Sequence, residues 1–272
     1  MHEANADTDS PAVAHATVPT PVSVAVAPEQ RRFFREQGYV VIPGVLSDAQ
    51  LARGRALVDA ILADDPPPPG HLGNLARWPR FGPDGHPLLD FYRDTGIARL
   101  AAGLVRTDLP LQDPDFAQLA VTIPPWQHWP GGPHLDGLTP PADDGVPGTF
   151  TLLAGVWLSD QSQFHQGNLW VWPGTHLRTG AYLAEHGAHA LARPDELGPG
   201  PYPPVDLGTP TQATGPAGSV LFAHYLLAHN IGGHDGPEDA GWRRTLYYRL
   251  SAAGHRERWT TAVTEPLHEF QL

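Results

Sequence analysis

Residues 131–137 carry two side chains that can bind one metal ion. The stretch reads Gly-Gly-Pro-His-Leu-Asp-Gly and places His134 and Asp136 two positions apart. Side chains two positions apart on extended backbone point in the same direction, so this imidazole and this carboxylate can bind the same cation. A second histidine would complete the set of two histidines and one carboxylate that leaves three positions of an octahedral iron(II) ion open.

His229 is the candidate for the second histidine. It ends an apolar run, residues 218–229, whose sequence predicts a buried strand. His224 in the same run is the competing ligand, and an odd spacing of five would turn the two histidines to opposite faces of a continuous strand. The chain has 15 histidines, so a His-x-Asp tripeptide also arises by chance. A hydrogen-bonded loop pair is the alternative interpretation of His134 and Asp136.

Arg243 is a further residue with the chemistry of a binding site. It follows His229 by 14 positions and lies in an apolar run, residues 242–250, that predicts another strand. A guanidinium at the base of a pocket can pair with a carboxylate through two parallel hydrogen bonds. Because side chains alternate along a strand, the adjacent Arg244 would face the opposite side, and the spacing alone leaves open which arginine faces the pocket.

The elements that must position these residues change in type along the chain. Helical periodicity and capping residues predict helices over residues 30–38, 49–63 and 94–105. Short apolar runs bounded by turn residues predict strands over residues 39–43, 116–123, 150–158, 169–172, 219–227 and 245–250. Helices followed by short strands indicate a mainly β, α+β fold, in which an antiparallel sandwich or barrel is backed by N-terminal helices.

The domain organisation expected from this pattern is simple. Residues 1–28 are rich in Ala, Val, Pro, Thr and Ser and lack the basic and apolar regions of a secretion signal, so a disordered tail is expected there. Residues 29–272 are expected to form a single domain. Within it, residues 179–216 contain many Pro and Gly with weak periodicity, which predicts a long loop near the mouth of the barrel.

Composition narrows the set of partners and metal sites. Acidic residues outnumber basic ones by 12 and no basic stripe is present, so nucleic acid is not an expected partner. The chain has no cysteine, which excludes disulfides, thiolate zinc sites and iron–sulfur clusters and leaves His and carboxylates as metal ligands. No apolar run is long enough to cross a membrane, and a cytoplasmic enzyme is expected. Nothing in the sequence indicates an oligomeric state.

Taken together, the motifs resemble the phytanoyl-CoA dioxygenase family of 2-oxoglutarate oxygenases. The resemblance covers most of residues 30–250. It is carried by residues 34–43 (FREQGYVVIP), the His134 and Asp136 pair, residues 167–176 (GNLWVWPGTH), residues 218–229 and Arg243. It implies a double-stranded β-helix core, of the jelly-roll and cupin-like kind, that carries the metal site.

The resemblance also implies the cofactors and the reaction. Iron(II) would be held by His134, Asp136 and His229, and the far carboxylate of the cosubstrate 2-oxoglutarate would pair with Arg243. O2 is the other cosubstrate, and the products are succinate, CO2 and a substrate oxidised at a C–H bond. Gln118 and Trp157 are two further candidates for cofactor binding. In relatives, the strands that correspond to theirs contact 2-oxoglutarate.

Two details of the sequence bear on this assignment. Residues 230–241 form a longer link than is usual in the family and lack its Gly-Pro-Asn-x-Ser wording, which puts the choice between Arg243 and Arg244 in question. Arg243 is favoured because the family's arginine follows a bulky residue, here Trp242. Related halogenases have Gly or Ala at the position of Asp136, so an aspartate there favours oxygenation over halogenation.

Other functions and other roles for the remaining residues stay open. A barrel that binds a metal or ligand without turnover is one alternative, and a hydrolase with zinc in the same triad is another, although the latter has no use for Arg243. A small organic molecule or secondary metabolite is the expected substrate, because no Lys/Arg cluster suggests a site for CoA phosphates. Desaturation, epoxidation and rearrangement are open besides hydroxylation.

Three further motifs are assigned without a role in metal binding. His176 is expected to orient a loop beside the mouth of the barrel. His255 is interpreted as part of a charged surface, together with Arg256 and Glu257. The aromatic residues at 126–129 could line a substrate pocket or pack in the core.

Overall fold

The computed structural model describes residues 25–137, 143–192 and 202–271. Most of the expected tail, residues 1–28, lies outside these ranges. Its last residues belong to the folded part, because Val26 is buried and the first helix begins at Pro28. The expected boundary at residue 29 is therefore too late by a few residues.

Most of the described helices come early in the chain, as expected. They are α1 (Pro28–Gln37), α2 (Asp48–Asp64), α3 (Pro87–Asp94), α4 (Ile97–Ala102), α5 (Thr175–His186), the 3₁₀ helix Ala188–Ala192 and α6 (Trp259–Thr264). At the start of α2, the hydroxyl of Ser47 accepts a hydrogen bond of 3.3 Å from the backbone N–H of Gln50, which caps the helix. The helix expected over 94–105 is shorter, because a turn at Thr95 separates α4 from α3.

The strands form two antiparallel sheets. The larger has the order β1-β7-β4-β9-β3-β2, and the smaller has the order β6-β5-β8. The strands of the larger sheet are β1 (Tyr39–Ile42), β2 (Gly73–Arg77), β3 (Gln118–Ile123), β4 (Leu152–Trp157), β7 (Val220–His224) and β9 (Arg243–Leu250). Those of the smaller sheet are β5 (Leu169–Val171), β6 (Thr211–Gln212) and β8 (His229–Ile231).

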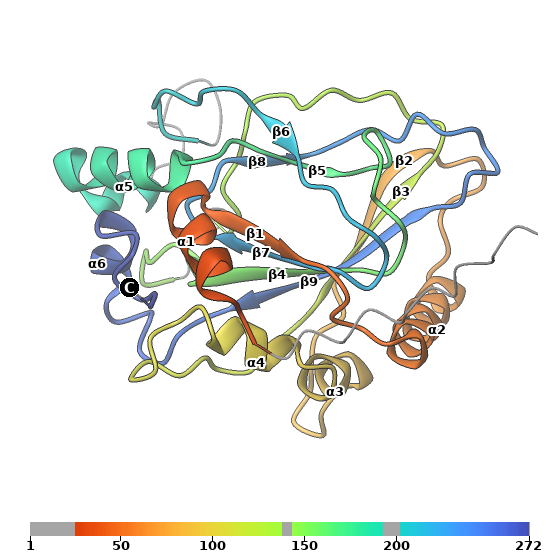
Figure 1. Ribbon diagram of the computed structural model, residues 1–272, viewed down its shortest axis with the longest axis horizontal. Helices are drawn as coiled ribbons and strands as arrows, with labels where there is room; N and C mark the ends of the chain where they lie inside the picture. Colours follow the sequence, from red (N-terminus) through yellow and green to blue (C-terminus); the bar gives the residue numbers. More distant parts are fainter. Residues whose placement is uncertain (1–24, 138–142, 193–201, 272) are drawn as a thin grey trace, which may run out of the picture.

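The sheets and helices form layers, which Figure 1 shows with the smaller sheet on one side of the larger sheet and helices α2, α3 and α4 on the other. Side-chain alternation along β9 explains how both faces of the larger sheet are buried. Leu246 and Tyr248 belong to the apolar cluster that includes the helices, while Tyr247 belongs to the cluster shared with the smaller sheet. This arrangement is consistent with a jelly-roll-like core.

The run 218–229 is not one strand, contrary to the expectation. β7 ends at His224, the next residues turn, and β8 begins at His229 in the other sheet. Leu226 and Leu227 are fully buried in the turn, so an apolar sequence continues where the strand does not. The argument that His224 and His229 face opposite sides of one strand is therefore wrong, although the two residues do lie in different surroundings.

Residues 179–216 are also not the continuous loop that was expected. Their first part belongs to α5 and the following 3₁₀ helix, while residues 193–201 lie outside the described ranges. Packing explains the helix, because Leu183 is fully buried and a methyl group at Gly180 would lie 2.3 Å from Pro266. Within the described residues, no helix is long and apolar enough to cross a membrane.

Candidate metal centre

His134, Asp136 and His229 lie together in the structure. One ligand atom from each residue can be chosen so that all three atoms lie within 4.8 Å of one another. Oδ1 of Asp136 is 3.5 Å from Nε2 of His134 and 3.8 Å from Nε2 of His229. Two imidazole nitrogens and one carboxylate oxygen therefore face a common point, which is the geometry that three protein ligands of one metal ion require.

Backbone pairing fixes the relative position of the two histidines. The N–H of His134 donates a hydrogen bond of 3.1 Å to the carbonyl of His229, so the segment before Asp136 pairs with the edge of β8. Nδ1 of His229 lies 2.9 Å from the carbonyl of Leu227. A carbonyl can only accept, so Nδ1 carries a proton, and in the neutral imidazole Nε2 then keeps the lone pair that a metal needs.

Gly137 permits the turn that follows Asp136. Its φ of +73° lies in the left-handed region. Its carbonyl accepts a 2.9 Å hydrogen bond from the N–H of Gly148, and a Cβ at position 137 would lie 2.1 Å from the carbonyl oxygen of Gly148. A side chain at position 137 would therefore push apart the two segments that hold Asp136 in place.

The electrostatics of the cluster favour an ionised carboxylate. Burial raises the pKa of Asp136, but the close contacts with His134 and His229 and the charge of Arg249 hold it well below its usual range. Burial and the neighbouring His229 lower the pKa of His134, against the opposing effect of Asp136. Burial also acts to lower the pKa of His229, yet the hydrogen bond and charge of Asp136 raise it overall. An anionic carboxylate next to a neutral His134 suits a divalent cation.

A cavity of about 260 Å³ opens onto the three ligand groups. Gln118 and Arg243, both expected near a cosubstrate, contribute to its wall. Trp157 does not line it: its ring is fully buried in the apolar cluster between the sheets and packs against Gly215, so its part in cosubstrate binding stays a prediction. The wall consists of Asn74, Gln118, Ala120, His134, Asp136, Leu153, Leu169, His229, Asn230, Ile231, Arg243 and Tyr247.

Arg243 and Arg244 face opposite sides of the larger sheet. Arg243 is only 2% exposed, and its Nη2 donates a 2.7 Å hydrogen bond to the hydroxyl of Tyr247 in the cavity wall. Its Nε donates a longer bond of 3.4 Å to the side chain of Gln161. Among the described residues, no carboxylate lies within ion-pair distance of Arg243. Arg244 instead forms a 2.6 Å ion pair with Asp59 on the helix side.

Three residues of the site were not anticipated from the sequence. Tyr247 and Gln161 orient Arg243, and Arg249 forms a 3.3 Å ion pair with Oδ2 of Asp136. Alternation along β9 could have identified two of them, since Tyr247 and Arg249 are four and six positions from Arg243 and share its face. Nothing in the sequence around Gln161 marks it, because its role depends on a loop that packs against β9.

No protein-family model matches the chain, and no curated protein matches it either. Among solved structures, it is similar to the non-heme α-ketoglutarate-dependent carbocyclase SnoK from nogalamycin biosynthesis, with a TM-score of 0.56 and 22% identity over 82% of this chain and 83% of that one. HygX from Streptomyces hygroscopicus, solved with nickel and 2-oxoglutarate, gives a TM-score of 0.54 and 18% identity over 84% and 87%.

A third solved structure has the same fold. The non-heme α-ketoglutarate-dependent epimerase SnoN, also from nogalamycin biosynthesis, gives a TM-score of 0.55 and 20% identity over 82% of both chains. At identities this low, the structural similarity establishes the fold alone. The chain shares its mixed architecture with antiparallel sheets with these proteins.

The other histidines with buried side chains have structural partners. His176 lies in the first turn of α5, and its Nε2 is 3.0 Å from the carbonyl of Arg35 in α1. It therefore joins two helices, whereas it was expected to orient a loop beside the cavity. His224 is also buried, with Nε2 2.6 Å from the carbonyl of Pro266. Neither histidine contributes to the wall of the metal cavity.

His255 is not part of a charged surface, and that interpretation is wrong. It is 4% exposed, and its Nδ1 lies 2.8 Å from Oε2 of Glu269. The hydroxyl of Thr151 donates a 2.6 Å hydrogen bond to the same carboxylate oxygen, and Arg258 forms an ion pair of 2.9 Å with the other oxygen. The partner that buries His255 is 14 residues away, and the sequence around His255 gives no sign of it.

The aromatic segment 126–129 is not part of the wall of the metal cavity. The rings of Trp126 and His128 stack with centroids 4.5 Å apart, and Trp129 is 69% exposed. None of these residues lines the metal cavity. The expectation that they line a substrate pocket is not supported for this cavity.

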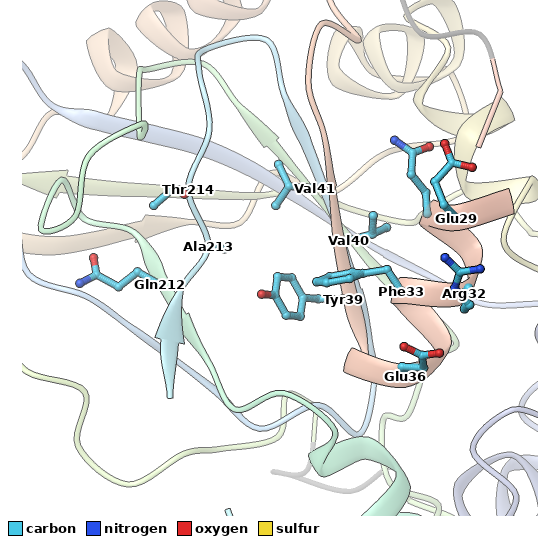
Figure 2. Close-up of a pocket in the computed structure, with 11 residues that line it drawn as sticks. Glu29, Arg32, Phe33, Glu36, Tyr39, Val40, Val41, Gln212, Ala213 and Thr214 are labelled. Atoms are coloured by element: carbon cyan, nitrogen blue, oxygen red, sulfur yellow. The ribbon is translucent and has the colours of Figure 1, made fainter. Parts of the chain in front are cut away.

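A second cavity of about 580 Å³ lies between α1, β1 and β6, and Figure 2 shows its wall. Tyr39 and Val41 project into it from the edge strand β1, and Glu29, Arg32 and Glu36 surround it from α1. Its wall contains no histidine. The three ligand groups therefore open onto the smaller cavity and not onto this one.

Proposed function

We propose that the protein is an iron(II)- and 2-oxoglutarate-dependent dioxygenase with a double-stranded β-helix core. His134, Asp136 and His229 would hold the metal, since two imidazoles and one carboxylate are a common ligand set of non-haem iron(II) and leave coordination positions open. The donor chemistry fits this ion, because the carboxylate is ionised and Nδ1 of His229 can donate to the Leu227 carbonyl, which leaves Nε2 of the neutral ring to bind a metal. The solved structures with the same fold include one with nickel and 2-oxoglutarate bound.

The observation that carries the proposal is the buried Arg243. A guanidinium at 2% exposure without a carboxylate partner among the described residues is costly unless an anion joins it. It opens into the same cavity as the three ligand groups. A dicarboxylate that binds a metal at one end and Arg243 at the other would compensate the buried charge, and 2-oxoglutarate has this form.

The residues of the chain have separate tasks in this proposal. Bound iron(II) would couple the oxidative decarboxylation of 2-oxoglutarate by O2, which gives succinate and CO2, to oxidation of a C–H bond in the substrate. Tyr247 and Gln161 hold the Arg243 guanidinium in one orientation, so the cosubstrate carboxylate meets a preformed site. Leu153, Leu169 and neighbouring apolar side chains limit the access of water to the cavity.

The substrate we propose is a small organic molecule. Solved structures with this fold include one of HygX with hygromycin B bound and one of SnoN with a nogalamycin compound bound. SnoK is a carbocyclase and SnoN is an epimerase, so ring formation and epimerisation are compatible with this scaffold and stay open beside hydroxylation. Asp136 would occupy the coordination position that halogenation needs for chloride, so we propose oxidation of a C–H bond without halogenation and take hydroxylation as its simplest form.

The test is cosubstrate turnover by the purified chain. With iron(II), O2 and 2-oxoglutarate, we expect slow formation of succinate even without the substrate, and loss of this activity and of metal binding in His229→Ala. His186→Ala is the matched control, because His186 is exposed on α5 and should leave both unchanged. Succinate formation that persists in His229→Ala would refute the proposed ligand set. A hydrolytic activity that needs zinc and no 2-oxoglutarate would support the rival metalloenzyme.

A further inference from the structure

Arg249 connects β9 to the metal centre. On β9, residues 243, 245, 247 and 249 alternate to the same face, which is the face of the cavity. Nη2 of Arg249 lies 3.3 Å from Oδ2 of Asp136, whereas the other carboxylate oxygen, Oδ1, is the one near both imidazoles. The two oxygens of one carboxylate therefore have different partners.

Aromatic rings hold the Arg249 guanidinium in place. Its central carbon lies 5.4 Å from the ring centroid of Trp78, 5.6 Å from that of Phe116 and 5.5 Å from that of Phe150. Contacts of this length between a cation and a ring are attractive and restrict the side chain. The Arg249 side chain is 21% exposed, so little of it can move freely in solvent. This cage fixes the position from which Arg249 reaches Asp136.

We propose that Arg249 is a positioning residue that turns the Asp136 carboxylate so that Oδ1 alone binds the metal. The inference rests on the proposed function. A carboxylate without such a partner can rotate, and it can bind a metal through both oxygens, which would occupy a position needed by cosubstrates. Outer groups that orient a metal ligand usually act through this kind of contact. Arg249 thus has a task distinct from that of Arg243, although both lie on one strand.

Two rival roles make different predictions for metal binding. If Arg249 acts only through its charge, it repels the cation, and its removal should strengthen metal binding. If it only supports the packing of Trp78, Phe116 and Phe150, its removal should lower stability without changing metal affinity. A positioning residue should instead weaken metal binding when it is lost, at little cost to the fold.

The experiment measures Mn(II) binding to the full chain by titration without O2, together with thermal unfolding. Methionine at position 249 keeps length and ring contacts but cannot donate, so Arg249→Met should raise the dissociation constant about 10- to 100-fold. Arg249→Lys keeps one charged donor and should recover part of the affinity. The matched control is Arg244→Met, which removes an arginine from the opposite face of the same strand and should leave Mn(II) binding unchanged.

Trp78→Leu supplies a second variant in case Arg249→Met does not fold. Trp78 is 48% exposed, so its loss threatens the core little, and it should weaken Mn(II) binding less than Arg249→Met does. Mn(II) binding by either variant as tight as that of the unchanged chain would overturn the positioning role. If the unchanged chain does not bind Mn(II), the proposed function fails. If it binds Mn(II) and the variants bind equally tightly, only the positioning role fails, so the two failures are distinguishable.

Discussion

Two adjacent arginines of β9 carry the same charge into different surroundings. Arg243 is buried at the metal cavity and is oriented by Tyr247 and Gln161, whereas Arg244 pairs with Asp59 beside the helices. A surface pair of the second kind contributes little to stability. A buried guanidinium that meets a ligand carboxylate has a much larger effect, because water cannot replace either partner.

Replacement of Arg243 by alanine tests this difference at the scale of one residue. Truncation of one partner of a buried charged pair costs about 2 to 5 kcal/mol, so Arg243→Ala should raise the Michaelis constant for 2-oxoglutarate on the order of 100-fold. Mn(II) binding should stay within a few-fold, since Arg243 has no contact with the three ligands. Succinate formation across a 2-oxoglutarate series measures the effect, with Arg244→Ala as the control. Full activity of Arg243→Ala at low 2-oxoglutarate would contradict the assignment.

The sequence was sufficient for the residues whose role depends on local spacing. The two-residue spacing of His134 and Asp136 predicted that they lie together, and the structure brings them together with His229. Alternation along β9 indicates the face of Arg249 but not its partner Asp136, and Gln161 was missed because its role depends on a loop that packs against β9. His255 was misinterpreted for a similar reason, since Glu269 reaches it from the last residues of the chain.

At the scale of elements, the most important connection is the one between β7 and β8. The apolar run 218–229 predicts a strand correctly at its start, because residues 220–223 pair with β1 and residues 220–224 pair with β4. Hydrophobicity reports burial and cannot distinguish a continued strand from a buried turn. The turn carries the chain from the larger sheet to the smaller one, where His229 can pair with His134. The break in the strand is thus a requirement of the metal site.

The segment that holds Asp136 depends on another element, the turn at Gly137. Alanine in the left-handed region costs about 1 kcal/mol, and the contact with the Gly148 carbonyl should add about 1 to 3 kcal/mol. Gly137→Ala should therefore lower the free energy of unfolding and weaken Mn(II) binding, because Asp136 is the adjacent residue. Urea unfolding and Mn(II) titration measure the two effects.

Gly145→Ala is the matched control for this prediction. Gly145 has nearly the same φ, +74°, but a Cβ there would meet no atom within 4 Å. It should show only the cost of the backbone conformation and leave Mn(II) binding unchanged. Equal effects of the two substitutions would mean that the close approach of Gly148 does not hold the metal segment.

At the scale of the whole molecule, Glu269 and Phe270 contact residues that are distant in the sequence. Glu269 receives a hydrogen bond from Thr151 and pairs with His255 and Arg258. Burial raises the pKa of Glu269, but the contact with His255 and the other partners lower it overall, so the carboxylate stays ionised at neutral pH. Phe270 then packs against Phe34 of α1, with ring centroids 5.0 Å apart. The first helix and the last residues therefore share one packing region.

The same region contains the buried pair His176 and His224, which should make the whole molecule sensitive to acid. Burial lowers the pKa of His224 to about 3 and that of His176 to about 4. The neighbouring His176 further lowers the pKa of His224, and the charge of Arg178 further lowers that of His176. Between these values and about 6.5, the usual pKa of a histidine, the unfolded chain binds more protons than the folded chain. The free energy of unfolding therefore falls as pH falls through this window, and the contribution is fully present above it.

His224→Gln isolates one of these protons. Each group contributes a slope in the free energy of unfolding that approaches about 1.4 kcal/mol per pH unit well below pH 6.5. Between pH 6 and pH 5, the slope of the variant should therefore be smaller by about this amount. This window lies above the titration of Glu269, whose pKa is lowered, so the carboxylate does not mask the effect. Urea unfolding at pH 7, 6 and 5 gives the slopes, with His186→Gln on the exposed face of α5 as the control. Because glutamine also loses contacts of His224, the variant should be less stable at pH 7, and only the slope tests the argument. An unchanged slope would mean that His224 is already protonated in the folded chain.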